Sequence, residues 1–188
     1  MRITPLELPG LLRIDPVRHS DSRGYFVETY RADVLAKAGA DVAFIQENQS
    51  LSQVAGTVRG LHYQLPPAAQ AKLVRVIRGR VLDVAVDLRR GSSSFLRHVA
   101  VELSAQNGAQ LFIPVGFAHG FATLEPDTEL LYKVSAPYAP QLDRGLQFDD
   151  PALGIAWPPI ASRERLSAKD QALPSLAELE GTGWPDWS

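Results

Sequence analysis

Six consecutive residues, 59–64 (RGLHYQ), combine a cation, a glycine, an imidazole, a phenol and an amide. Successive side chains of a β-strand point to opposite faces, so Gly60 and His62 would share one face while Arg59 lies on the other. A bend or bulge at Gly60 would let Arg59 and His62 converge, because glycine adopts backbone shapes that other residues avoid. The stretch therefore predicts a base beside an anion site on a β scaffold.

Polar side chains also recur within segments that otherwise resemble apolar strands. They are His62, Lys72, Asp83, His119 and Tyr132, with Asp170 nearer the end of the chain. Inward-facing polar groups cost free energy unless they bond to each other or to a ligand. Alone, Lys72 is better explained as a solvated charge and Tyr132 as core packing, and a structural role stays open for His62. Asp83 interrupts an apolar pattern, which favours an ion pair or a site.

Short strand-like segments separated by turn signals make up most of the chain. Gly79 and the Asn107-Gly108 pair mark hairpins. Helices are expected at 31–40, ended by Gly39, and at 166–170, capped by Ser167. The pattern predicts an all-β fold, a jelly-roll β-sandwich or barrel with a few short peripheral helices. The expected strands span residues 11–17, 25–30, 44–51, 57–64, 72–78, 80–88, 97–103, 110–114, 118–124 and 129–134.

Length and composition bound the class of protein. The 188 residues suffice for a single domain over 1–188, and two tail segments rich in proline and tryptophan, 149–159 and 181–187, are expected to wrap its core. A net charge of −2 argues against non-specific nucleic-acid binding. The absence of cysteine excludes disulfides, zinc–thiolate sites and thiol catalysis. With no signal peptide and no apolar run near the ~20 residues of a membrane helix, a soluble cytoplasmic protein is expected.

The spacing Pro114-x-Gly116-x-x-His119 resembles the second signature of the cupins, a jelly-roll superfamily. In metal-binding cupins that histidine is a ligand, and the first signature supplies a His-x-His pair. Here Gln64 stands two positions after His62, and the other two of the four histidines lie outside both signatures. A three-nitrogen metal site cannot be built in that way. We therefore expect a cupin-like pocket without a metal.

A longer series of segments resembles the dTDP-4-dehydrorhamnose 3,5-epimerase family, a nucleotide-sugar branch of the cupins. The resemblance implies a cofactor-free enzyme of dTDP-L-rhamnose biosynthesis. Its substrate would be dTDP-4-dehydro-6-deoxy-D-glucose, whose C3 and C5 are inverted to give dTDP-4-dehydro-L-rhamnose. The matching segments, from about Asp21 to Asp170, are DSRGYFVETY, FIQENQS, VRGLHYQ, AKLVRVIRGRVLDVAVDLR, FIPVGFAHGF, LLYKVSAPY, DDPALGIAWP and LSAKD.

The resemblance also implies the residues of proton transfer. Both carbons adjoin the C4 ketone, so each inversion is deprotonation to an enolate and reprotonation from the opposite face. That chemistry needs a base, an acid across the ring and a cation at the enolate oxygen. By match to the family, His62 is the base and Asp170 fixes its tautomer. Lys72 would stabilise the enolate and Tyr132 would deliver the proton, with His119 and Asp83 lining the pocket.

Binding positions and assembly follow from the same resemblance. Arg59 and Arg23 would hold the diphosphate, and Tyr138 would stack on the thymine. Asp143 stands where the family usually has Glu, which would alter a substrate contact and leave the chemistry intact. The remaining substrate positions are Phe26, Glu28, Gln46, Asn48 and Lys169. The working unit would be a homodimer that exchanges N-terminal strands within residues 1–30, around a jelly-roll core of about 40–150 and a C-terminal wrap of 151–188.

Other functions stay open at this point. Some relatives invert only C3 or only C5, and the placement of Tyr132 and Tyr138 could decide whether the second proton is delivered. A ketoisomerase on the same scaffold should lack this set of His, Lys, Tyr and Asp. A non-catalytic nucleotide-sugar-binding protein would have lost one of His62, Tyr132 and Asp170, and all three are present. A metal-dependent oxygenase lacks the ligands.

Overall fold

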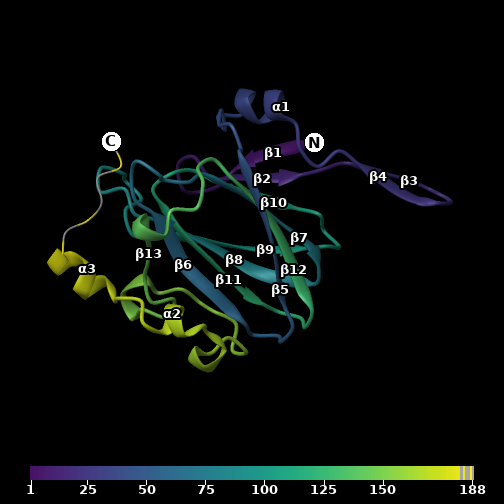
Figure 1. The fold of residues 1–188 in the computed structure, drawn as a ribbon. Helices are drawn as coiled ribbons and strands as arrows, with labels where there is room; N and C mark the ends of the chain where they lie inside the picture. The colour runs from purple at the N-terminus through teal and green to yellow at the C-terminus, as the bar shows by residue number, and fades with distance from the viewer. Residues whose placement is uncertain (183, 185–186, 188) are drawn as a thin grey trace.

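Two antiparallel β-sheets lie face to face and form a β-sandwich (Figure 1). The computed structural model describes residues 1–182, 184 and 187. This arrangement confirms the predicted all-β class. The first sheet has the order β1 (Arg2–Pro5), β2 (Leu12–Asp15), β10 (Gln110–Ile113), β7 (Lys72–Arg78), β12 (Thr128–Val134) and β5 (Gln46–Ser52). The second has the order β13 (Asp143–Gly145), β6 (Val58–Gln64), β11 (Phe117–Thr123), β8 (Arg80–Asp87) and β9 (His98–Ser104).

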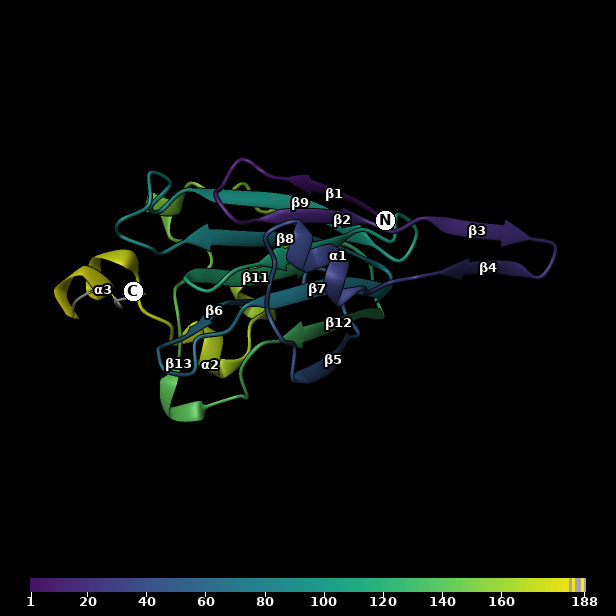
Figure 2. The ribbon, with the colours of Figure 1, turned by 90° about the horizontal axis from the view of Figure 1, so that it is seen from above.

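A two-stranded ribbon and a few short helices surround the sandwich. Figure 2 shows that the ribbon, β3 (Arg18–Asp21) and β4 (Gly24–Val27), projects from one end. The two C-terminal helices lie on the side of β6 and β13 (Figure 1). No helix of the described residues is long and apolar enough to cross a membrane. The helices are α1 (Ala32–Lys37), α2 (Ala168–Gln171) and α3 (Leu176–Thr182), with 3₁₀ turns η1 (Pro140–Leu142), η2 (Pro151–Leu153) and η3 (Arg163–Arg165).

The alternation of side chains divides the apolar residues into an inner core and two outer layers. Val76 of β7 and Val81 of β8 belong to one buried cluster that takes residues from both sheets. Leu73, on the other face of β7, packs instead with the residues around α1. Val84, on the other face of β8, packs with the C-terminal segments. Since Asp83 alternates with Val84, its carboxylate points inward, toward the core that the two sheets share.

The C-terminal part of the chain covers the outer face of the second sheet. Leu153 and Leu176 pack against Val84 in one cluster. Trp157 donates its indole N–H to the carbonyl oxygen of Phe148 at 2.7 Å. The second tail segment expected to wrap the core, 181–187, includes residues 183, 185 and 186, which lie outside the described residues.

Strand β6 carries the bulge that was expected at Gly60. The register between β6 and β11 shifts, because Arg59 pairs with Phe121 and His62 pairs with His119. Three residues along β6 therefore match two residues along β11. Gly60 has a φ of 118°, and a Cβ there would lie 2.6 Å from the Cα of Gly120. Because the extra residue changes the alternation, Arg59 and His62 both line the same cavity.

Candidate active site

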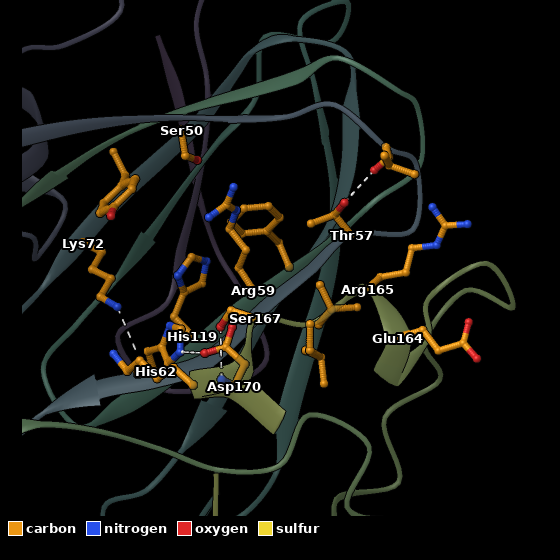
Figure 3. A pocket seen from close by; sticks show the side chains of 16 residues that line it. Ser50, Thr57, Arg59, His62, Lys72, His119, Glu164, Arg165, Ser167 and Asp170 are labelled. Atoms are coloured by element: carbon orange, nitrogen blue, oxygen red, sulfur yellow. Dashed lines mark hydrogen bonds and ion pairs between the residues drawn. The ribbon is translucent and has the colours of Figure 1, made fainter. Parts of the chain in front are cut away.

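A cavity of about 700 Å³ opens between the two sheets (Figure 3). The first sheet contributes Lys72 and Tyr132, the second contributes His62 and His119, and α2 contributes Asp170. Figure 3 shows Glu164 and Arg165 at the far end of the cavity from Lys72. The rest of the lining is Ser50, Val54, Thr57, Val58, Arg59, Phe121, Leu166, Ser167 and Lys169.

A second cavity of about 350 Å³ adjoins the first one. The two share His62, Lys72, Tyr132 and Lys169 in their walls, so they form one continuous site. The second cavity brings in four more of the expected binding residues, Gln46, Asn48, Tyr138 and Asp143.

His62 and Asp170 form a hydrogen-bonded pair, with His62 Nε2 2.6 Å from Asp170 Oδ1. Ser167 caps α2 as expected, because its hydroxyl accepts the Asp170 backbone N–H at 3.1 Å. Burial acts to raise the pKa of Asp170, but the contacts with His62, the backbone N–H of Gly60 and the charge of Lys169 together lower it by more. The ionised carboxylate therefore holds the proton on Nε2 and leaves Nδ1 as the basic nitrogen.

A second such pair lies beside the first. His119 is directly opposite His62 in the pairing of β11 with β6. Its Nε2 lies 2.9 Å and 3.0 Å from the two carboxylate oxygens of Asp83. Both side chains are buried. The Asp83 carboxylate, which interrupts an apolar pattern, therefore has a hydrogen-bond partner in His119.

Lys72 is a buried cation at the junction of the two cavities. Its ammonium lies 3.5 Å from the carbonyl oxygen of His62, on the facing sheet. Burial lowers the pKa of Lys72 to about 8, although the charges of Asp143 and Asp83 act to raise it. Because this pKa is above 7, most of the ammonium stays charged at neutral pH and can stabilise a developing anion in the cavity.

Tyr132 reaches the cavity from the sheet opposite His62. Burial raises the pKa of its phenol, while the charge of Arg59 and a hydrogen bond from Asn48 act to lower it. A phenol with a raised pKa keeps its proton at neutral pH, so Tyr132 can act as a proton donor.

Arg59 lies on the wall of the larger cavity, and its position is fixed by strand β5. It donates to the hydroxyl of Ser52 at 3.3 Å and to the carbonyl oxygen of Leu51 at 3.0 Å. Neither partner is an acid, so the positive charge is not neutralised by these contacts. The guanidinium remains suited to an anionic group of a ligand.

Asp143 holds two of the expected binding residues together. The hydroxyl of Tyr138 donates to its carboxylate at 3.0 Å, and the ammonium of Lys169 donates to the same oxygen. The Asp143 carboxylate, which stands where the family usually has the longer Glu, is thus hydrogen-bonded to residues of its own chain. Tyr138 remains 55% exposed, so its side chain is accessible to a ligand.

Three expected binding residues lie outside both cavities. Arg23 and Phe26 belong to the projecting ribbon and its turn, and Glu28 follows β4. Arg23 pairs with Asp21 of the same ribbon, and Phe26 is 71% exposed. Within the described chain, the site is therefore built without these three residues.

Several lining residues were not singled out from the sequence. Ser50 and Phe121 lie two positions after Asn48 and His119 on the same strands, so alternation could have found them. Glu164 and Arg165 lie in a 3₁₀ turn and carry no such signal. In the described chain, no group of three or more His, Cys, Asp or Glu side chains is arranged to hold a metal ion.

Comparisons with known proteins agree on one family. The family model of dTDP-4-dehydrorhamnose 3,5-epimerase matches residues 5–178. A curated relative of that description, from Sinorhizobium fredii, is 52% identical over 179 residues, which cover 95% of this chain and 91% of the relative.

Solved structures extend the likeness to ligand complexes. A dTDP-6-deoxy-D-glucose-3,5-epimerase from Legionella pneumophila, in complex with dTDP-4-keto-L-rhamnose, has a TM-score of 0.91 and 38% identity. That match covers 100% of this chain and 98% of the other. A 3′-monoepimerase from Streptomyces bikiniensis, in complex with dTDP-quinovose, has a TM-score of 0.90 and 37% identity over 97% of this chain and 92% of its own.

Proposed function

The chain belongs to the dTDP-4-dehydrorhamnose 3,5-epimerase family, and from this membership we propose how its site inverts two carbons. The chain is an isomerase that converts dTDP-4-dehydro-6-deoxy-D-glucose to dTDP-4-dehydro-L-rhamnose, a step of dTDP-L-rhamnose biosynthesis. One observation carries the mechanism. A histidine with a basic nitrogen and a protonated tyrosine face one cavity from opposite sheets, with a buried lysine beside them.

The first half of each inversion is proton abstraction by His62. Its Nδ1 takes the proton from C3 or C5, and the electrons of the broken C–H bond move into a carbon–carbon double bond. The electron pair of the C4 carbonyl then rests on oxygen as an enolate, beside the ammonium of Lys72. Asp170 stabilises the imidazolium that forms. A positioned general base contributes roughly 10²–10⁴-fold to the rate.

The second half is proton delivery by Tyr132. The phenol gives its proton to the face opposite His62, the C–H bond forms with inverted configuration, and the C4 ketone returns. Solvent water then restores the proton of Tyr132, while His62 releases the proton it took. Support for this division comes from the placement of the two residues on different sheets.

Binding is proposed to span both cavities. Arg59 would hold the diphosphate and Tyr138 would stack on the thymine, with Lys169 and Asp143 beside it. We also propose a homodimer in which the partner's ribbon brings Arg23, Phe26 and Glu28 to this site. The exposure of Phe26 and the projection of the ribbon support that assignment. The domain limits and the cytoplasmic location expected from the sequence stay predictions.

The deciding experiment follows protons by NMR in D₂O. Purified protein is incubated with dTDP-4-dehydro-6-deoxy-D-glucose, and a His62→Ala variant is the control. Deuterium should enter at both C3 and C5, the L-sugar should form, and both signals should vanish in the control.

Two other outcomes would change the proposal. Deuterium at one carbon alone would assign a mono-epimerase, the activity of the 37% identical Streptomyces bikiniensis protein. Binding without exchange at either carbon would overturn the proton-transfer mechanism and leave a nucleotide-sugar-binding protein.

A further inference from the structure

A chain of hydrogen bonds runs along the wall of the smaller cavity toward the phenol of Tyr132. It begins at the backbone N–H of Tyr138, which donates to Gln46 Oε1 at 3.2 Å. Gln46 Nε2 then donates to Asn48 Oδ1 at 2.8 Å. Asn48 lies directly opposite Tyr132 in the pairing of β5 with β12, and both side chains line the smaller cavity.

The direction of this chain is fixed by its first member. A backbone N–H can only donate, so Gln46 must present its oxygen to Tyr138 and its NH₂ group to Asn48. Asn48 must then accept through Oδ1, which leaves its own NH₂ group available as a donor on the side of Tyr132. Each amide orientation is set by the one before it.

This arrangement determines where the hydroxyl of Tyr132 can donate its proton. The Asn48 side chain acts to lower the pKa of the phenol, which is the effect of a donor on the phenol oxygen. Within the described chain, no acceptor for the Tyr132 hydroxyl proton is found. Tyr132 and Asn48 both line the smaller cavity, where the substrate would lie. The hydroxyl proton is therefore free for a ligand group in that cavity.

We propose that Gln46 and Asn48 are positioning residues, which direct the Tyr132 proton toward the substrate and stabilise the phenolate that its transfer leaves. This inference rests on the proposed function. It gives the two amides, expected from the sequence to bind substrate, a role in the acid step. When the Tyr132 O–H bond breaks and the new C–H bond forms, the phenolate keeps the electron pair and accepts the Asn48 N–H as a charge-assisted hydrogen bond.

The test reverses the direction of the chain. In Gln46→Glu the carboxylate still accepts the Tyr138 N–H but cannot donate to Asn48. The Asn48 amide must then rotate. Its Oδ1 would accept the hydroxyl proton of Tyr132 and so hold that proton away from the substrate. Asn48→Asp produces the same capture directly, because a carboxylate can only accept.

The readout is the ratio of deuterium exchange without inversion to inversion, measured by NMR in D₂O. Both variants should keep exchange by His62 while inversion slows, so the ratio should rise about tenfold, the effect of one hydrogen bond. A merely structural role for the amides would lower exchange and inversion together.

The matched control is Gln70→Glu, which brings the same charge into the same cavity. Gln70 donates to the carbonyl oxygen of Ala136 and has no bond to this chain. Its ratio should stay at the parent value. An equal rise in Gln70→Glu, or parent ratios in both folded test variants, would overturn the inference while leaving the function intact. Absence of exchange and inversion in the parent protein would instead overturn the proposed function itself.

Discussion

At the scale of single residues, the two histidine–aspartate pairs differ in access to the cavity. The side chain of His62 is 28% exposed, whereas that of His119 is 9% exposed and its carboxylate partner is fully buried. A base must approach the carbon that it deprotonates. The difference therefore favours His62 as the base and gives His119 and Asp83 a supporting role in the wall.

Replacement of Asp170 by Asn should slow turnover with little effect on nucleotide binding. The amide cannot stabilise the imidazolium or hold the proton on Nε2, so kcat should fall by about 10²–10⁴-fold. The Kd for dTDP, measured by titration calorimetry, should change less than threefold, because Asp170 does not line the cavity of Tyr138. A variant within about threefold of the parent in kcat would show that the pair is structural.

The pKa of Lys72 leads us to expect a basic limb in the pH dependence, that is, a fall in activity at high pH. Burial lowers its pKa to about 8, so the ammonium loses its proton as the pH rises through that value. Above pH 8, kcat/KM should then fall about tenfold per pH unit if the charge stabilises the enolate. Steady-state rates from pH 6 to 10 measure the limb.

Lys72→Met provides the comparison for that limb. The variant should lose about 10²–10³-fold in kcat at pH 7, as expected for one missing stabiliser of a developing oxyanion. It should also lack the limb near pH 8. A limb that persists unchanged in the variant would assign the titration to another group.

The site could be predicted from the sequence only in part. The apolar pattern around Asp83 singled out that carboxylate for an ion pair or a site, and a glycine beside Arg59 predicted the bulge. The bond between His62 and Asp170 joins residues 108 positions apart, and no local pattern encodes such a contact. Pairing Asp170 with His62 came from family resemblance, whereas the capping role of Ser167 followed from helix chemistry.

At the scale of elements, the bulge in β6 depends on two glycines that touch. A Cβ on Gly60 would lie 2.6 Å from the Cα of Gly120 and 2.7 Å from the carbonyl oxygen of His119. Gly60→Ala should therefore lower the free energy of unfolding by about 3 kcal/mol, from overpacking and from its positive φ. Urea unfolding measures the loss, and activity should fall because His62 and His119 move.

The Gly24→Ala variant separates the stability cost of a positive φ from the cost of overpacking. Gly24 has a φ of 132°, but nothing lies within 4 Å of the position that a Cβ would take. This variant should lose only about 1 kcal/mol. Similar losses for Gly24→Ala and Gly60→Ala would contradict a packing role for the bulge.

Element prediction succeeded where burial imposes a pattern. The long strands β6, β7, β8 and β12 lie within two residues of their expected bounds, because their apolar residues alternate or run together. Strands β1 and β3 were missed. Their four residues each are almost entirely exposed, so no hydrophobic period marks them. The expected strand 25–30 instead ends at Val27, which is the last residue of the exposed ribbon.

At the scale of the whole molecule, stability in acid should depend on Asp87 at the end of β8. Burial acts to raise the pKa of Asp87, but hydrogen bonds from Arg89, Ser94 and Ser92 lower it to about 2. A lowered carboxyl pKa adds stability above the unfolded value near 3.8, and that stability is lost as the pH falls toward 2. Asp87→Asn should cost about 2 kcal/mol at pH 7, and its difference from the parent in thermal unfolding should shrink below pH 4. A difference that is constant with pH would contradict the linkage.

Exchange of the ribbon between two copies predicts complementation in mixed dimers. His62→Ala removes the base from a chain's own site, whereas Arg23→Ala would remove a cation from the partner's site. Each variant alone should be inactive or nearly so. In a mixed dimer, one site carries both defects and the other carries none, because its His62 and its incoming Arg23 come from unaltered parts of the two chains.

Random reassociation after co-expression or mild denaturation makes half of the dimers mixed. With one intact site out of two in each, activity should return to about a quarter of the parent value, as a two-fold symmetric assembly requires. If each site used its own Arg23, the mixture would contain no intact site and activity would stay at the average of the two variants. Sedimentation of the mixture distinguishes that outcome from a failure to dimerise, since a monomeric parent protein would already exclude the exchange.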